Sequence, residues 1–291
     1  MFAHSGRAAL AAACLVLCAC GTPEFPGTGG RRAATGAAGI SLSPAANAAQ
    51  IPSPGDGDIP REDAIDAPAA PNTGRGILRG KVLFKGPVPP RQKAMVVKDG
   101  AVCGKINHLD DRLVVCATGG IEHAVVSIRG VKGGKPIAAL GREFVLDQRT
   151  CAYSPHVLLV PKGENLRILN NDGVLHNIHT FSTINKPFNV AQPKVLKEIR
   201  RSFAECERIP VRCDVHGWMS SWVVVVDHPY HAVTDAEGRF EISGIPPGRY
   251  TIECWQEELG VQTAEVAIGN GDSPATHDFV YSRPEDRAKL N

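Results

Sequence analysis

The segment from Asn170 to Met219 places the strongest constraint on the fold, because it carries metal-binding side chains near both of its ends. His176 lies near the start, and Cys213, His216 and Met219 follow at three-residue steps at the end. Such steps on a tight loop bring successive donors to one centre, whereas His176 has to reach that centre from elsewhere in the chain. A thiolate, two imidazoles and a weak thioether are the donors of a mononuclear blue-copper site. We therefore predict one copper ion per chain, held by these four residues.

The spacing of these residues resembles that of a known family. The pattern C-x-x-H-x-x-M at 213–219 follows the pattern N-x-D-x-x-x-H-N-x-H at 170–179, and together they resemble the small blue-copper proteins (cupredoxins), amicyanins in particular. The resemblance covers roughly residues 141–227. It implies that His176, Cys213 and His216 are strong ligands, that Met219 is a long axial ligand, and that His179 is not a ligand.

The same resemblance assigns roles around the metal. Asn177 would tie its own loop to the loop that bears Cys213, as residues behind metal ligands commonly do. Gly217 and Trp218 would form an apolar rim beside His216, where a redox partner docks and the electron leaves, although Trp218 could equally pack inside the protein. His156 is a candidate for an extra ligand, and the alternative is a strand histidine that is hydrogen-bonded to the backbone.

The amino-terminal residues predict export and a membrane anchor. Residues 1–20 have a short apolar run of the kind found in secretory signals, and the sequence Leu17-Cys18-Ala19-Cys20-Gly21 resembles a bacterial lipobox. That resemblance implies a lipid on Cys20, at the periplasmic face of the bacterial cell envelope, and Thr22 favours the outer membrane. The alternative is an ordinary cleaved signal. Residues 21–74 are dominated by Ala, Gly and Pro and predict a disordered tether, because they cannot bury a core.

The remaining residues predict an all-β chain. The formal net charge is +2 and the basic residues are scattered, so we expect no nucleic-acid partner. β-Branched runs bounded by Gly, Pro and Asp recur at short intervals, which is typical of β-sandwiches and β-barrels. Within the ligand-bearing part, alternating Ile209, Val211 and Cys213 predict that Cys213 points inward from a strand end. The continuous apolar run Trp222–Val226 is typical of a buried final strand.

A second resemblance fixes the predicted domain order. The motif T-D-x-x-G-x-F-x-I at 234–242, followed by P-P-G-x-Y at 246–250, resembles the carboxypeptidase regulatory-like domain, a small transthyretin-like sandwich. Its first strands would lie at 80–83 and 124–128, before the copper region, and residues 231–242 would form a hairpin around an Asp/Gly turn. We therefore predict a Greek-key cupredoxin sandwich (139–228) inserted between two parts of the regulatory-like sandwich (75–138 and 229–283), with a tail at 284–291. A tandem arrangement is the alternative.

The cysteines add a further constraint. Outside the first twenty residues the chain has six cysteines: Cys103, Cys116, Cys151, Cys206, Cys213 and Cys254. If Cys213 binds copper, five remain, so at most two disulfides form and one thiol stays free. We favour a bridge between Cys103 and Cys151, although connectivity cannot be deduced from sequence. In the competing interpretation all six pair and no copper binds.

Three functions fit these observations. The first is a non-catalytic electron carrier with one type 1 copper, served by an unidentified redox protein. The second is a copper oxidase or reductase, which needs an open coordination position. Met219 argues against an open site, since an oxygen or nitrogen donor such as Glu198 or His156 would first have to displace its thioether. The third is a metal-free interaction or carbohydrate-binding scaffold, since fold alone does not decide function.

Overall fold

The computed structural model describes residues 76–271 and 273–283, and all of the following observations concern these residues. The predicted signal (1–20), the tether (21–74), the tail (284–291) and the lipidation site Cys20 lie outside them. The prediction of an all-β chain is confirmed: the described residues form strands, with one α-helix, α1 (Gly100–Cys103), and one 3₁₀ helix, η1 (Ile137–Leu140). No helix in the described part is long and apolar enough to cross a bilayer.

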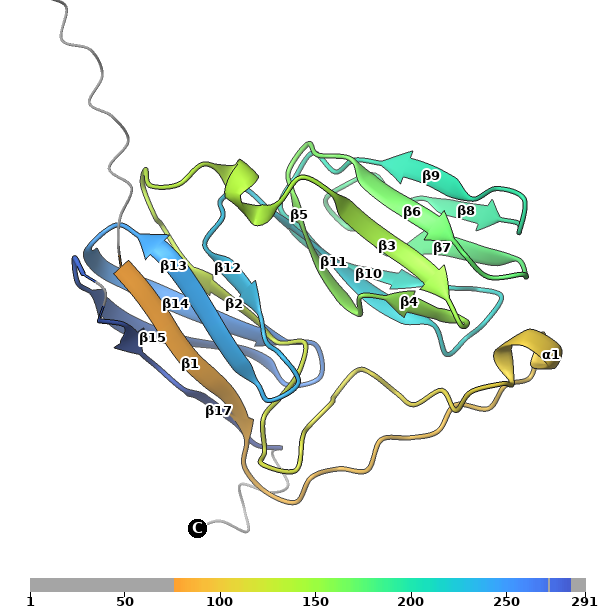
Figure 1. The fold of residues 1–291 in the computed structure, drawn as a ribbon, viewed down its shortest axis with the longest axis horizontal. Helices are drawn as coiled ribbons and strands as arrows, with labels where there is room; N and C mark the ends of the chain where they lie inside the picture. Colours follow the sequence, from red (N-terminus) through yellow and green to blue (C-terminus); the bar gives the residue numbers. More distant parts are fainter. Residues whose placement is uncertain (1–75, 272, 284–291) are drawn as a thin grey trace, which may run out of the picture. The chain divides into compact units, whose positions relative to one another are not determined.

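The strands at the two ends of the described chain form the flanking sandwich. Its strands are β1 (Gly76–Phe84), β2 (Val125–Ile128), β12 (His231–Val233), β13 (Arg239–Ile245), β14 (Gly248–Gln256), β15 (Gly260–Ile268), β16 (Ala275–Thr276) and β17 (Phe279–Tyr281). One sheet has the order β13-β1-β16, with β17 also paired to β1, and the other has the order β12-β2-β14-β15 (Figure 1). Leu78, Val82 and Phe84 alternate along β1 and pack with Phe240 and Ile252 in a core between the sheets.

The strands between β2 and β12 form the central sandwich. Its strands are β3 (Phe144–Arg149), β4 (Ala152–Ser154), β5 (Val157–Pro161), β6 (Leu166–Asn170), β7 (His176–Thr180), β8 (Asn189–Gln192), β9 (Glu198–Arg201), β10 (Glu207–Arg212) and β11 (Ser220–Val226). The two sheets have the orders β5-β11-β10-β7-β8 and β4-β3-β6-β9. Leu146, Ile168, Ile178 and Ile209 are fully buried between them.

Strand β11 is apolar on both faces, as its sequence predicts. Val223 and Val225 point into the core of the central sandwich. Because successive side chains of a strand point to opposite faces, Val224 and Val226 point the other way, and they pack with Trp255 of β14. The continuous apolar run therefore exists because both faces of this strand are covered.

Strand pairing connects segments from both ends of the described chain. Strand β1 pairs with β13, and β2 pairs with both β12 and β14. The strands before and after the central sandwich therefore share the sheets of the flanking sandwich, which is the pairing that an inserted central sandwich requires.

The predicted hairpin at residues 231–242 is wrong in its pairing. Strand β12 pairs with β2, whereas β13 pairs with β1 in the other sheet. The Asp/Gly turn itself is present: Asp235 Oδ1 accepts a hydrogen bond from the backbone N–H of Arg239 at 2.8 Å, and Gly238 has φ +73°. This turn carries the chain from one sheet to the other, since β12 and β13 pair with β2 and β1, which come earlier in the sequence.

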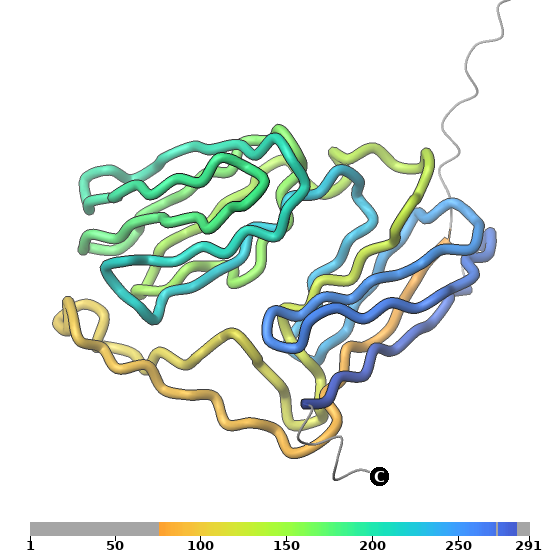
Figure 2. The backbone as a smooth tube through the Cα atoms, turned by 180° about the vertical axis from the view of Figure 1, so that it is seen from behind, coloured from red at the N-terminus to blue at the C-terminus, as the bar shows by residue number. Residues whose placement is uncertain are grey.

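Residues 86–118, which we call the arm, connect β1 to β2 by a long excursion (yellow in Figure 2). The arm folds back on itself: the backbone N–H of Ala94 donates to the carbonyl of His108 at 2.8 Å, and that of Asp110 donates to the carbonyl of Gln92 at 2.8 Å. Helix α1 lies near its tip. A disulfide joins Cys103 of the arm to Cys151 of the central sandwich.

Candidate metal centre

Two of the three strongest predicted ligands lie at the ends of neighbouring strands, and the third, His216, lies in the loop between β10 and β11. His176 is the first residue of β7, and Cys213 directly follows β10, which pairs with β7. Ile209 and Val211 of β10 are buried, and Cys213 continues their alternation with 2% of its surface exposed. The loop after Cys213 is tight, because the backbone N–H of Met219 donates to the carbonyl of His216 at 2.9 Å.

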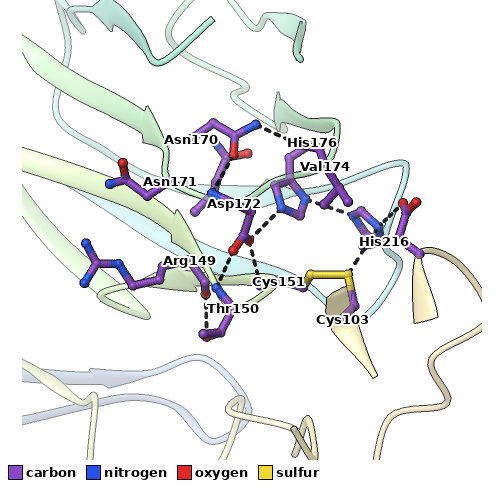
Figure 3. Close-up of polar contacts among 12 residues, drawn as sticks. Cys103, Arg149, Thr150, Cys151, Asn170, Asn171, Asp172, Val174, His176 and His216 are labelled. Carbon is purple, nitrogen blue, oxygen red and sulfur yellow. Dashed lines mark hydrogen bonds and ion pairs between the residues drawn. A yellow bond between two sulfur atoms is a disulfide. The ribbon is translucent and has the colours of Figure 1, made fainter. Parts of the chain in front are cut away.

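The structure brings three donor atoms together. His176 Nδ1 lies 2.9 Å from His216 Nδ1, and Cys213 Sγ lies 3.8 Å from His216 Nδ1. All three residues are buried, and they form a group that could hold a metal ion. Figure 3 shows a nitrogen of the His176 ring directed toward a nitrogen of the His216 ring, and the two ring planes are inclined by 61°. Met219 is 2% exposed and belongs to the same buried cluster as Cys213.

The far nitrogen of each imidazole faces a carboxylate. His176 Nε2 lies 2.8 Å from Asp172 Oδ2, and His216 Nε2 lies 2.9 Å from Asp99 Oδ2. A carboxylate only accepts hydrogen bonds, so each Nε2 carries the proton and donates it. In the neutral form of each ring, the lone pair is therefore at Nδ1. Burial lowers the pKa of His176, although its hydrogen bond to Asp172 acts in the opposite direction, and the lowered pKa favours the neutral ring.

This arrangement leaves two acceptors facing each other. When both rings are neutral and both Nε2–H groups donate to carboxylates, neither ring has a hydrogen to place between the Nδ1 atoms, which are 2.9 Å apart. Two unpaired acceptors buried at this distance are unfavourable, unless a cation lies against both. With the sulfur of Cys213 next to them, the donor set fits a soft or borderline metal such as copper.

Asp172 is held in place by the backbone around it. Its carboxylate accepts hydrogen bonds from the backbone N–H groups of Thr150 and Cys151, both at 2.7 Å, and its own N–H donates to Asn170 Oδ1 at 3.0 Å (Figure 3). Cys151, Asp172 and His176 also form a metal-capable group by geometry. The sulfur of Cys151 is in a disulfide, so it offers no thiolate, and the group serves to orient His176.

Asn177 connects the two ligand-bearing segments. Its Oδ1 accepts hydrogen bonds from the backbone N–H groups of Asp214 at 2.6 Å and Val215 at 3.3 Å, and its Nδ2 donates to Asn189 Oδ1 at 2.7 Å. His179 Nδ1 interacts instead with Asp214, at 3.0 Å, and takes no part in the metal-capable groups of the described residues.

His156 does not join the site. Its Nε2 contacts Glu257 of the flanking sandwich, and it belongs to neither metal-capable group found among the described residues. The interpretation of His156 as an extra ligand is therefore corrected. The reason is its position directly before β5, where its ring contacts the flanking sandwich rather than His176.

The exposed edge expected at His216 is absent. The His216 side chain is 0% exposed, because the arm covers it. Gly217 is exposed, but Trp218 is only partly so: its Nε1 donates to the carbonyl of Cys151 at 3.0 Å, and its ring lies against those of His216 and His108. Trp218 thus packs beneath the arm, which was the alternative interpretation.

Two carboxylates of the site had no role in the prediction from sequence, although one of them, Asp172, belongs to the motif at 170–179. Asp172 stands four residues before His176, and this short spacing is a signal that could have identified it. Asp99 lies 117 residues from His216, in a segment without a motif, and the sequence contains no signal for it.

The predicted disulfide between Cys103 and Cys151 is confirmed. The remaining cysteines of the described residues are free thiols, namely Cys116, Cys206, Cys213 and Cys254. The competing interpretation, in which every folded-domain cysteine is paired, is therefore wrong, and Cys213 is free to act as a ligand.

Comparisons with known proteins concern parts of the chain. A family model described as polysaccharide lyase family 4, domain II matches residues 209–276. The purple cupredoxin from Nitrosopumilus maritimus is similar, with 23% identity and a TM-score of 0.26 over 29% of this chain and 100% of that chain. An oxidised amicyanin variant has 20% identity and a TM-score of 0.27 over 35% of this chain and 98% of that one.

A copper-containing nitrite reductase from Thermus scotoductus has 18% identity and a TM-score of 0.26, over 34% of this chain and 24% of that one. No curated protein sequence gave a match.

Proposed function

We propose that this protein is a copper-binding electron carrier of the bacterial cell envelope, with one copper ion held by His176, Cys213, His216 and Met219. The observation that carries the proposal is the pair of Nδ1 atoms 2.9 Å apart, each on a ring whose other nitrogen donates to a carboxylate. Copper in such a donor set supplies reversible one-electron chemistry.

The chain's own residues keep the donors in one arrangement. Each ligand-bearing segment begins at a strand end, Asn177 ties the two segments together, and the two carboxylates fix the orientation of the imidazoles. Donors that are already in place need little rearrangement when the oxidation state changes, which suits transfer of a single electron.

We favour a carrier over an enzyme. An enzyme of this kind needs an open coordination position or a second metal centre. Both metal-capable groups of the described residues contain His176, so they form one site rather than two. The site is also buried, because His176 and His216 are each 0% exposed among the described residues, and this burial argues against direct access of a substrate.

The proposed location and partner rest on the sequence. The lipobox-like sequence ending in Cys20 supports lipid anchoring at the periplasmic face of the envelope, and the partner we propose is a redox protein.

The test is a visible absorption spectrum of residues 76–291 and of the full mature chain after Cu(II) addition, beside Cys213→Ser. We expect one copper per chain and an intense thiolate-to-copper band that disappears in the variant. The matched control is Cys254→Ser, a buried free thiol in the core of the flanking sandwich, which should keep the band. A wild-type protein without stoichiometric copper would overturn the proposal.

A carbohydrate-related role is the second candidate. It is favoured by the match of residues 209–276 to a polysaccharide lyase domain. The matched segment contains Cys213 and His216 but not His176, so it does not account for the complete donor set. Binding of polysaccharides by a protein that takes up no copper would favour this candidate.

A further inference from the structure

We propose that the arm is an integral part of the metal centre and that Asp99 is a positioning residue for His216. The proposal rests on the proposed copper function for the identity of the metal. It goes beyond that function because Asp99 belongs to a segment between β1 and β2, outside the sandwich that supplies the four donors.

Asp99 is fixed by its own backbone. It precedes helix α1 with φ 51°, a left-handed conformation that is uncommon for a residue other than glycine. Its carbonyl accepts hydrogen bonds from the backbone N–H groups of Val102 at 2.9 Å and Cys103 at 2.8 Å. These bonds retain the unusual conformation, which directs the carboxylate to His216 Nε2, 2.9 Å away.

The arm is fastened around this contact. The disulfide from Cys103 to Cys151 joins it covalently to the central sandwich, and Cys103 Sγ lies 3.7 Å from His216 Nε2. His108 Nε2 lies 2.9 Å from the carbonyl of Cys103, and the His108 ring lies 5.4 Å from that of Trp218. The arm thus contacts His216 through Asp99 and Cys103, and it contacts the neighbouring Trp218 through His108.

Two effects on the ligand follow. The hydrogen bond places the proton on Nε2, so the lone pair of His216 is at Nδ1, facing His176. A histidine ligand bonded to a carboxylate is also a stronger base, and the nearby negative charge favours the higher oxidation state of a bound metal. Removal of the charge should therefore raise the reduction potential.

The first experiment needs no metal. Long-range ¹H–¹⁵N spectra of the metal-free protein report the tautomer of each histidine ring. We expect the Nε2-protonated form of His216 in the wild type and in Asp99→Asn, whose amide oxygen still accepts, and a mixture of tautomers in Asp99→Ala. The matched control is Asp111→Asn, an arm carboxylate that pairs with Arg91 and does not contact His216. An unchanged tautomer in Asp99→Ala would overturn the proposal.

The second experiment uses Cu(II) alone as the probe. We expect Asp99→Ala to bind copper about 10-fold to 100-fold more weakly, the usual effect of removing a residue behind a metal ligand. Asp99→Asn should keep most of the affinity but show a higher reduction potential, because the charge is lost and the hydrogen bond is kept. A potential in Asp99→Asn equal to that of Asp111→Asn would contradict the proposed role of the charge.

The two proposals fail in different ways. If the wild type takes up no copper, the proposed function fails, while the tautomer spectra still decide whether Asp99 orients His216. If the wild type shows the thiolate-to-copper band and both Asp99 variants match it in affinity, potential and tautomer, only the role of Asp99 fails. Circular dichroism of each variant identifies any that does not fold. If Asp99→Ala does not fold, Asp99→Asn, which replaces one carboxylate oxygen by an amide group, serves as the second variant.

Discussion

Asn177 Oδ1 accepts hydrogen bonds from the backbone N–H groups of both Asp214 and Val215. Asn177 follows His176 directly, and Asp214 follows Cys213 directly. One amide group thus joins the two segments that carry the proposed ligands His176 and Cys213. These segments are far apart in the sequence.

We expect Asn177→Ala to weaken copper binding by about 10-fold to 100-fold, the range found when groups behind metal ligands are removed. Competition with a copper chelator measures this affinity. The control is Asn171→Ala, on the same segment, whose side chain contacts Asp147 at 2.9 Å and not the Cys213 loop. Equal affinities for the two variants would contradict the role of Asn177.

Gly238 should be the less tolerant of two turn glycines. Gly238 and Gly260 both have positive φ, +73° and +80°, so alanine at either costs about 1–2 kcal/mol of backbone strain. A Cβ at Gly238 would also lie 2.5 Å from the carbonyl oxygen of Val82, whereas a Cβ at Gly260 meets nothing. We expect Gly238→Ala to lower the free energy of unfolding more than Gly260→Ala does, measured by urea denaturation. Equal losses would contradict this steric argument.

The disulfide should contribute measurably to stability. Cys103 and Cys151 are 48 residues apart, and closing a loop of this length stabilises the folded state by about 4 kcal/mol in the chain-entropy model. We expect Cys103→Ser/Cys151→Ser to lose an amount of this order in urea denaturation under non-reducing conditions. Cys116→Ser, which removes a free thiol of the same arm, should change little. A double variant as stable as the wild type would contradict the prediction.

His231 should make the protein less stable in acid. Burial lowers its pKa to about 3, with further lowering by His228, Arg208 and Arg129. Both of its ring nitrogens are buried without a hydrogen-bond partner. The ordinary pKa is about 6.5, so between these values the unfolded chain binds the proton and the folded protein does not. Above about pH 6.5, His231 therefore does not lower the free energy of unfolding. As the pH decreases below this value, the free energy of unfolding falls.

The test compares the free energies of unfolding at pH 7.5 and pH 5. We expect His231→Asn to reduce the loss between these conditions by on the order of 1 kcal/mol, given about 1.4 kcal/mol per pKa unit. His277→Asn, which alters a histidine that packs on Phe279, is the control. A pH dependence unchanged by His231→Asn would contradict the prediction.

Features that depend on local pattern were predictable from the sequence. Alternation along β10 placed Ile209 and Val211 in the core, and the three-residue steps of Cys213, His216 and Met219 placed them on one loop. The apolar run of β11 indicated a buried strand, and the structure shows that both of its faces are covered.

Features that depend on distant segments were not predictable. The turn at Asp235 was evident, but the choice of β1 as the partner of β13 depends on residues far upstream. The burial of His216 depends on the arm, which contacts the site through Asp99, through the disulfide of Cys103 and through the ring of His108. The candidate metal donors could be predicted from the sequence because few residue types can act as donors. The segment that buries them could not be predicted, since its position depends on tertiary structure.

The pairing of β2 with β12 has a consequence for how such a chain could arise and fold. Ser127 lies opposite His231 on adjacent antiparallel strands, so the central sandwich leaves and rejoins its host at neighbouring points. The loop-closure entropy of a long connection grows only slowly with its length, and here the folded insert itself holds the two ends together. The whole central sandwich thus lies between two paired strands of the flanking sandwich, where two adjacent antiparallel strands are often joined by a short turn.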